Sequence, residues 1–318
     1  MVENTAFRIG LLLPTHAPHG RKLDGELLSS VAEWAEAAGF DGLWAGDHIV
    51  HPWQFLEALT SLTFVAARTR KIGIGTCVLQ LPMRQLAVAA AQIVTLSVLS
   101  DERFILGAGI GGEWPLEWQA AGVPTTERGA RLDEGLVLLK KLLTGEAVDF
   151  AGRFNRFEGR MSPVPGRLPI HLAGRAPAAL KRVGRIADGW IGFFVTPSGF
   201  RRDLAVIDTA REEAGRLGQP FERGALLNFH LDENEQRGEA RAFALNFGFP
   251  KEITLAGSDE QLKRFALLGS AASIIARIRE YAEAGCRNFV LSPVEKEGEA
   301  YQAQMRAFAE RVLPALRS

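Results

Sequence analysis

Short apolar runs alternate with amphipathic helical stretches along most of this chain. The candidate strands are Phe7–Leu13, Gly42–Ala45, Lys71–Thr76, Phe104–Ala108, Pro169–Ala173, Gly189–Phe193, Gly224–Phe229 and Arg287–Leu291. The stretches between them carry apolar residues every three or four positions, as at Leu132, Leu136 and Leu139. Strands that alternate with helices favour a parallel sheet covered by helices. Eight such units predict an α/β protein of the (β/α)8, or TIM-barrel, type.

The alternation is interrupted between Gly145 and Arg167. The segment VDFAGRFNRF, followed by Pro163 and Pro165, predicts a hairpin and an irregular connection. A second interruption covers Phe229–Gly257, and neither has a polar or Ser/Gly-rich linker beside it. We therefore expect a single barrel domain over residues 1–318, with an insertion between barrel units near residues 145–167.

The composition excludes several classes of partner. Lys+Arg and Asp+Glu both number 37, so no positive excess is available to neutralise a nucleic-acid backbone. The two cysteines, Cys77 and Cys286, lack the spacing of a zinc site or a disulfide framework. The N-terminal apolar run is too short for a signal or a membrane span. We expect a cytoplasmic protein that acts on a small molecule and holds no metal.

In a barrel of this type, the site lies where the strands run into the following helices. The second of these loops contains Asp47 and His48 side by side. An imidazole can hold or donate a proton near neutral pH, and a neighbouring carboxylate can fix its tautomer. We predict His48 and Asp47 as catalytic residues; the alternative is that Asp47 caps a helix and His48 only forms a hydrogen bond.

The fourth loop runs from Gly107 through Pro115 and contains a formal GxGxxG pattern, which raises a Rossmann alternative. That pattern should open the first strand–helix unit, and here it falls in the fourth. Gly109 and Gly111 are instead predicted to let a flat cofactor ring approach the backbone. Glu113 is a third catalytic candidate, although most loop glutamates are only surface residues.

The fifth loop has Gly174, Arg175 and Ala176 at the start of a helix. Free backbone N–H groups and the arginine would bind an anion such as a cofactor phosphate. The alternative is a plain turn with Pro177 at the first helical position.

Aromatic residues on the mouth loops are candidates for a substrate pocket. They are Trp53, Trp114 and Trp118, with His16 in the first loop. Thr76 and Cys77 end the third strand; nothing in the sequence activates Cys77 as a nucleophile, so a packed thiol is favoured.

Taken in order, several segments of the chain resemble the luciferase-like oxidoreductases that use FMN or the deazaflavin coenzyme F420. They include AAGFDGLWAGDHIVHP, RTRKIGIGTCVLQLP, ERGARLDEGLVLLKKL and LPIHLAGRAPAALKRVGRIADGW. The chain departs from the family pattern LDxLSGGR, because Ser97 replaces the acid and Asp101-Glu102 replaces the two glycines. The resemblance implies a (β/α)8 barrel with an insertion and, together with apolar helix faces, a homodimer.

The resemblance also implies the chemistry. Asp47 and His48 match the pair that deazaflavin-using members place beside the reactive ring, and Gly174 and Arg175 match the phosphate end of the cofactor site. Thr76–Cys77 is where members often have a non-prolyl cis peptide bond that supports the cofactor ring, so the resemblance implies that Thr76 and Cys77 bind the cofactor. We expect hydride transfer between F420 and a small organic substrate. The alternatives are an FMN-dependent monooxygenase that uses dioxygen and a non-catalytic flavin-binding protein.

Overall fold

The computed structural model describes residues 7–112, 114–246, 249 and 263–317. Eight parallel strands form one sheet in the order β10-β11-β12-β14-β1-β3-β5-β7, and β10 pairs with β7 to close it. The barrel strands are β1 (Arg8–Leu12), β3 (Gly42–Ala45), β5 (Gly73–Thr76), β7 (Phe104–Gly109), β10 (Ile170–Ala173), β11 (Gly189–Phe193), β12 (Glu222–Leu231) and β14 (Asn288–Pro293). The sequence prediction of a closed (β/α)8 barrel is confirmed, and the Rossmann alternative is wrong.

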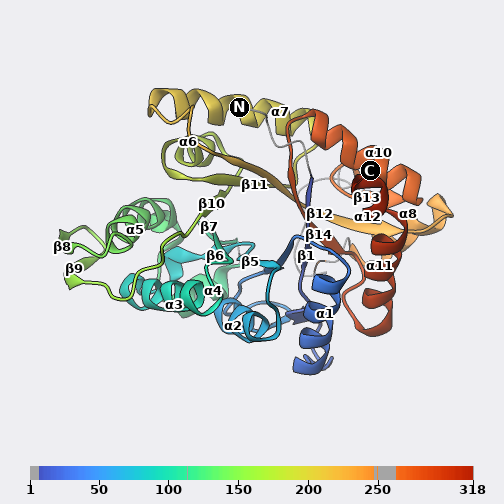
Figure 1. The fold of residues 1–318 in the computed structure, drawn as a ribbon, viewed down its shortest axis with the longest axis horizontal. Coiled ribbons are helices and arrows are strands. Elements are labelled where there is room, and N and C mark those ends of the chain that lie inside the picture. The colour runs from blue at the N-terminus through green and yellow to red at the C-terminus, as the bar shows by residue number, and fades with distance from the viewer. Residues whose placement is uncertain (1–6, 113, 247–248, 250–262, 318) are drawn as a thin grey trace.

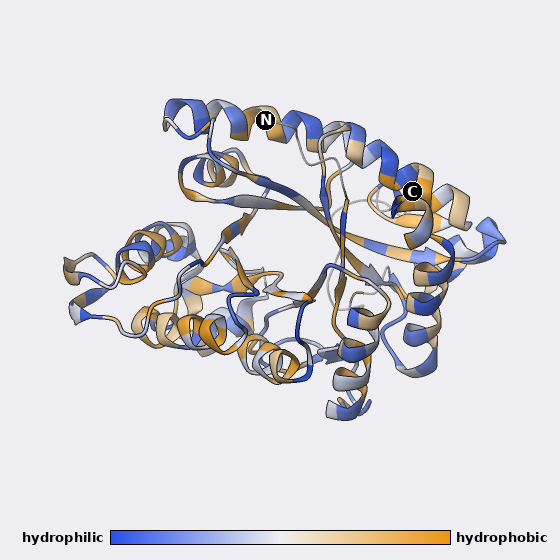
Figure 2. Cartoon of the chain, in the orientation of Figure 1, coloured by the Kyte–Doolittle hydropathy of each residue, from blue (hydrophilic) through white to orange (hydrophobic). Residues whose placement is uncertain are grey.

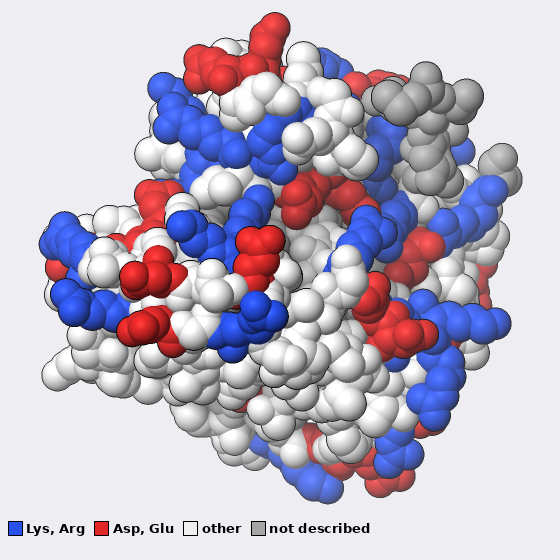
Figure 3. Space-filling model, turned by 60° about the vertical axis from the view of Figure 1, so that its left-hand side comes forward, with Lys and Arg blue, Asp and Glu red and all other residues white. Residues whose placement is uncertain are grey.

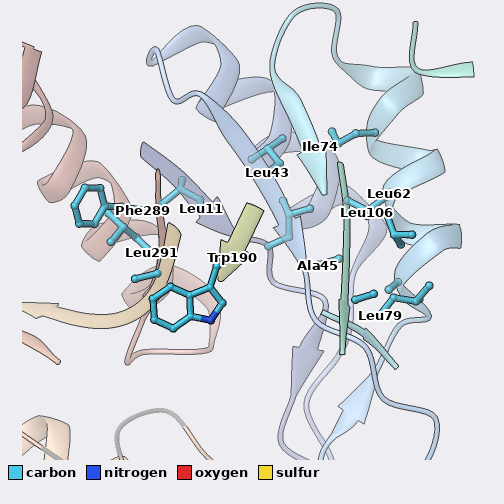
Figure 4. Packing of buried hydrophobic residues seen from close by; sticks show 14 of the residues in the cluster. Leu11, Leu43, Ala45, Leu62, Ile74, Leu79, Leu106, Trp190, Phe289 and Leu291 are labelled. Atoms are coloured by element: carbon cyan, nitrogen blue, oxygen red, sulfur yellow. The ribbon is translucent and has the colours of Figure 1, made fainter. Parts of the chain in front are cut away.

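Helices surround the barrel, as Figure 1 shows. They are α1 (Gly25–Ala37), α2 (Ala58–Arg68), α3 (Leu86–Leu99), α4 (Pro115–Ala121), α5 (Arg128–Leu142), α6 (Pro177–Ile186), α7 (Pro197–Glu213), α8 (Glu235–Ala244), α10 (Ala271–Glu283), α11 (Gly298–Arg311) and α12 (Leu313–Arg317). Their apolar faces and the strands share one large core. Figure 4 shows Leu11, Leu43 and Leu106 of the strands among these buried side chains. None of the helices in the described ranges is both long and apolar enough to cross a membrane.

Short strands lie outside the barrel proper. Two of them, β2 (His16–Ala17) and β4 (Gln54–Phe55), pair antiparallel above the barrel mouth. Beside β7 and β12 lie β6 (Leu79–Gln80) and β13 (Leu267–Gly269). The predicted hairpin is formed by β8 (Ala147–Ala151) and β9 (Arg156–Arg160), and it projects beyond α5 at the left of Figure 1. Within the second interruption, residues 247–248 and 250–257 lie outside the described part of the chain.

Glycine ends helix α1 and helix α10 where the chain turns back toward a strand. Gly39 and Gly285 have φ angles of 84° and 103°, in the region that side chains with a Cβ rarely adopt. Each residue follows the last turn of its helix directly, so the connection to the next strand stays short.

The turn from α3 to β7 uses the same left-handed region without glycine. Asp101 and Glu102 have φ angles of 56° and 58°, at the two positions where the resembled family has glycines. Ser97, in the place of the family's acid, is buried, and its hydroxyl has no hydrogen-bond partner in the described residues. A Cβ in this conformation costs about 1 kcal/mol.

We expect Asp101→Gly to raise the free energy of unfolding by about 1 kcal/mol, because glycine adopts a positive φ without steric cost. Chemical denaturation measures the change. Asp101→Ala, which keeps the Cβ, is the matched control and should bring no such gain. An equal gain in both variants would contradict the backbone explanation.

Candidate functional site at the barrel mouth

The predicted site residues lie at one end of the barrel. Asp47 and His48 follow β3, Cys77 follows β5, Gly109 ends β7, and Gly174 follows β10. Because the strands are parallel, their C-terminal ends all face the same mouth.

His48 is held by a carboxylate that the sequence analysis missed. Its Nδ1 lies 3.0 Å from Oε2 of Glu117, in the first turn of α4, and the backbone N–H of Ile49 donates to the same carboxylate at 2.7 Å. Burial alone would raise the pKa of Glu117, but the hydrogen bonds from His48, Ile49 and Gln80 lower it overall. Glu117 is therefore ionised near neutral pH and only accepts hydrogen bonds.

An ionised Glu117 fixes the tautomer of His48. Nδ1 must carry the proton that it donates to Glu117, so in the neutral ring Nε2 bears the lone pair. The His48 side chain is 26% exposed, and no described residue forms a hydrogen bond with Nε2. Nε2 is thus free to accept a proton from a bound molecule, or to return one.

Gln80 connects the loops around this pair. Its side-chain amide donates to the carbonyl of Asp47 at 2.6 Å and to Glu117 at 3.1 Å, and its Oε1 accepts from the backbone N–H of Gly112 at 3.1 Å. Three loops from different barrel units are tied together by one side chain. The arrangement keeps Glu117 within hydrogen-bond distance of Nδ1 of His48.

Asp47 has a different partner from the one predicted. Its carboxylate is fully buried, accepts two hydrogen bonds of 2.7 Å from the Arg84 guanidinium, and accepts a third from the backbone N–H of Gln80 at 2.8 Å. Arg84 also donates to Glu57 at 3.1 Å. The prediction that Asp47 fixes the tautomer of His48 is wrong, because Glu117 forms that contact and Asp47 anchors the loop.

Glu113, the third predicted catalytic residue, lies outside the described residues. Glu117 follows it by four positions, at the start of α4 just after Pro115. Pro115 and an acid in the first turn mark a helix start in the sequence. That signal could have placed Glu117 on a rigid element near the mouth, although not beside His48.

A cluster of aromatic rings covers the mouth next to His48. Phe55 of β4 packs against the rings of His16 (5.0 Å, nearly parallel), His48 (4.7 Å) and His51 (4.7 Å). Trp53 stacks on His16, with the two ring centroids 6.0 Å apart. Burial, followed by the charge of His48, lowers the pKa of His51 to about 4, so that ring is neutral near pH 7. His16 and Trp53 thus lie at the mouth, as the pocket prediction requires.

The other two tryptophans differ from each other. Trp114 is partly exposed at the N-cap of α4. Trp118 is only 2% exposed and donates its indole N–H to the carbonyl of Gly112 at 2.9 Å. The prediction that Trp118 lines the substrate pocket is wrong, because its ring packs beneath the loop and supports it.

The glycines of the fourth loop make room for protein atoms. A Cβ on Gly111 would lie 2.4 Å from Oε1 of Gln80 and 2.7 Å from the Trp118 ring, and one on Gly109 would lie 2.8 Å from Val78. These positions therefore need glycine for packing within the protein. Their predicted contact with a cofactor ring stays a prediction.

The third loop, which follows β5, contacts the neighbouring strand β7. The hydroxyl of Thr76 donates to the carbonyl of Gly107 at 2.7 Å, and burial raises the pKa of the Cys77 thiol to about 12. Cys77 is thus an inert, packed thiol near neutral pH, as expected. The non-prolyl cis peptide bond joins Cys77 to Val78, one position later than the resemblance implied.

A cavity of about 620 Å³ lies beside the fifth and sixth loops and is rich in arginine. Its lining includes Arg175, Arg202 and Arg264, while Asp203 is paired with Arg202 at 2.8 Å. Helix α6 begins next to Arg175, and no side chain caps its free N–H groups. Positive charge and backbone donors together suit a phosphate. A phosphate-bearing cofactor fits the residues that are present.

The fold is a closed (β/α)8 barrel, and a histidine–glutamate pair and an arginine-lined cavity lie at the C-terminal ends of its strands. These features place the protein among the barrel proteins that have their site at this end of the strands. The chain belongs to the luciferase-like monooxygenase family, whose model matches residues 7–288.

Curated relatives agree with this assignment, and solved structures agree with the fold. An uncharacterised protein of Mycobacterium tuberculosis is 33% identical over 257 residues, which cover 73% of this chain and 88% of the relative. An F420-dependent glucose-6-phosphate dehydrogenase of Kineococcus radiotolerans is 29% identical and covers 91% of this chain and 93% of its own. The structure of an F420-dependent secondary alcohol dehydrogenase with an F420-acetone adduct superposes with a TM-score of 0.82 at 20% identity, covering 98% of this chain and 100% of that one.

Proposed function

We propose that this protein transfers hydride between bound coenzyme F420 and a small organic substrate. The observation that carries the proposal is the His48–Glu117 pair at the barrel mouth, in which Nε2 of His48 has no hydrogen-bond partner among the described residues. The F420-dependent relative from Kineococcus radiotolerans, which covers nearly the whole chain, supports the choice of cofactor.

The chain offers a place for the phosphate end of such a cofactor. Arg175, Gly174 and the N-terminus of α6 would hold its phosphate, and the arginines of the adjoining cavity would balance further negative charge. The bound deazaflavin would supply the hydride chemistry, whereas the protein supplies position and protons.

His48 would act as the proton carrier for the substrate oxygen. In the oxidation of an alcohol, Nε2 accepts the hydroxyl proton; in the reverse reaction the protonated ring returns it. Glu117 would keep Nδ1 protonated and stabilise the imidazolium that forms. Gln80 and the Asp47–Arg84 ion pair would hold the loop of His48 and the segment of Glu117 in position.

The proposal is tested by incubating the protein and F420 with a panel of small alcohols and carbonyl compounds, with and without dioxygen, while following the deazaflavin absorbance. Hydride transfer predicts turnover that is unchanged when dioxygen is removed. Turnover that requires both FMN and dioxygen would favour the monooxygenase alternative instead. Cofactor binding without turnover of any compound in the panel would favour the non-catalytic alternative.

Arg175→Met is expected to weaken F420 binding about 10- to 100-fold, because a charge-assisted hydrogen bond to a phosphate is lost. Quenching of tryptophan fluorescence measures the dissociation constant. Arg185→Met, in the last turn of α6 away from the phosphate end, is the matched control and should bind as the wild type does. Equal affinity in the wild type and Arg175→Met would remove Arg175 from the cofactor site.

We further propose that the chain forms a homodimer through α3 and the neighbouring α2. Val88, Val98 and Leu99 of α3 are 59%, 44% and 64% exposed, and α3 carries no charged residue. Figure 2 shows this helix as largely hydrophobic, and the lower left of Figure 3 has few charged side chains. Sedimentation should give twice the chain mass of 34.7 kDa, and a monomer would contradict the proposal.

A further inference from the structure

Lys296 is an amine at the barrel mouth that the proposed reaction does not use. It follows β14, and its Nζ donates to the hydroxyl of Ser292 at 2.5 Å. The acidic neighbours Glu295 and Glu297 are engaged by arginines at 2.6 and 2.8 Å. In the described residues, no carboxylate forms an ion pair with Nζ, and burial lowers the pKa of Lys296 to about 7. When it is protonated, Nζ therefore has no carboxylate counter-ion among the described residues, and a bound anion would favour this charged form.

His16, near the same part of the mouth, has a buried polar atom without a partner. The residue is only 9% exposed, and its Nδ1 has no hydrogen-bond partner in the described ranges. Burial, and then the charges of Lys296, His48 and His51, hold the pKa of His16 well below its usual range. The ring is therefore neutral and can carry a proton on Nδ1 for donation.

The charges of Lys296 and His48 both lower the pKa of His16, so the three residues lie in one part of the mouth. His16 follows β1 and Lys296 follows β14, and these strands are hydrogen-bonded neighbours in the barrel. The rings of His16 and His48 both pack against Phe55, at 5.0 and 4.7 Å. A small molecule whose oxygen contacts His48 would reach toward His16 and Lys296 with its other end.

We propose that Lys296 and His16 form a subsite for a carboxylate, and that the substrate is a small hydroxy or oxo acid. This inference rests on the proposed function for the reacting end of the substrate. A carboxylate carries one negative charge, which would balance the charge of a protonated Lys296. Its second oxygen can accept a hydrogen bond from Nδ1 of His16. A phosphate would bring more charge than one amine balances, and the arginine-lined cavity suits that group better.

The test uses lactate, a hydroxy acid, and lactamide, its neutral amide, with the full-length protein. Binding is followed by tryptophan fluorescence, because Trp53 stacks on His16. Lactate should bind with saturation and lactamide at least tenfold more weakly. Lys296→Met should weaken lactate binding about 10- to 100-fold. Lys181→Met on the exposed face of α6 is the matched control and should leave binding unchanged.

Lys296→Arg, which keeps the positive charge, should retain more lactate affinity than Lys296→Met, and thermal unfolding of each variant verifies that it is folded. Equal lactate binding in the wild type and Lys296→Met, or equal binding of lactate and lactamide, would overturn the subsite. F420 binding is measured on the same samples. Loss of the subsite with F420 binding intact refutes this inference alone, whereas Lys296-dependent lactate binding without F420 binding refutes the proposed function alone.

Discussion

Replacing His48 with alanine is expected to lower kcat about 10²- to 10⁴-fold, the range for loss of a positioned general acid–base. The substrate oxygen would lose its proton acceptor, while the arginine-lined cavity that holds the cofactor phosphate is unchanged. F420 affinity should therefore stay close to that of the wild type. Steady-state kinetics and a fluorescence titration on the same preparation measure both quantities.

His19→Ala is the matched control for this substitution. His19 lies on a mouth loop as well, but its side chain is exposed. Its removal should change kcat less than twofold. The role assigned to His48 would be refuted by a His48→Ala protein that turns over at the wild-type rate.

Arg84→Met is expected to lower the free energy of unfolding by about 3–5 kcal/mol, because it leaves the buried carboxylate of Asp47 without its cation. The Asp47 side chain is fully buried and that of Arg84 is only 13% exposed, so water cannot replace the lost partner. Urea denaturation measures the change.

Arg68→Met provides the comparison with an exposed ion pair. Arg68 lies 3.9 Å from Glu33, and both side chains are 53% exposed. Its loss should cost less than about 1 kcal/mol. The double variant Asp47→Asn, Arg84→Met should recover part of the stability, since no charge then remains buried. Similar losses in the two arginine variants would contradict the structural role of the Asp47–Arg84 pair.

The barrel could be predicted because its signal is local and repeated. Each strand is a short apolar run beside an amphipathic helix, and the observed strands overlap all eight predicted ranges. The hairpin at residues 147–160 was likewise predictable from its own residues. The ends of β12 and β14 extend two residues beyond the predictions, at Leu231 and Pro293, because pairing with neighbouring strands continues there.

The contacts of the site were less predictable than its location. Loops at strand ends identified His48 and Asp47, but Glu117 is 69 residues from His48 in sequence, and Arg84 is 37 residues from Asp47. Which carboxylate contacts which partner is decided by how the three loops after β3, β5 and β7 pack together. Trp118 was misassigned for the same reason, since position on a mouth loop does not reveal whether a ring faces the mouth or the core.

The most direct test of hydride transfer at the barrel mouth is a paired titration of the protein with F420 and with FMN, followed by tryptophan fluorescence. We expect saturable binding of F420 at least tenfold tighter than that of FMN. We also expect Arg175→Met to weaken F420 binding. Tighter binding of FMN would contradict hydride transfer through a deazaflavin, and binding of neither cofactor would contradict the assignment of the barrel mouth as a redox site.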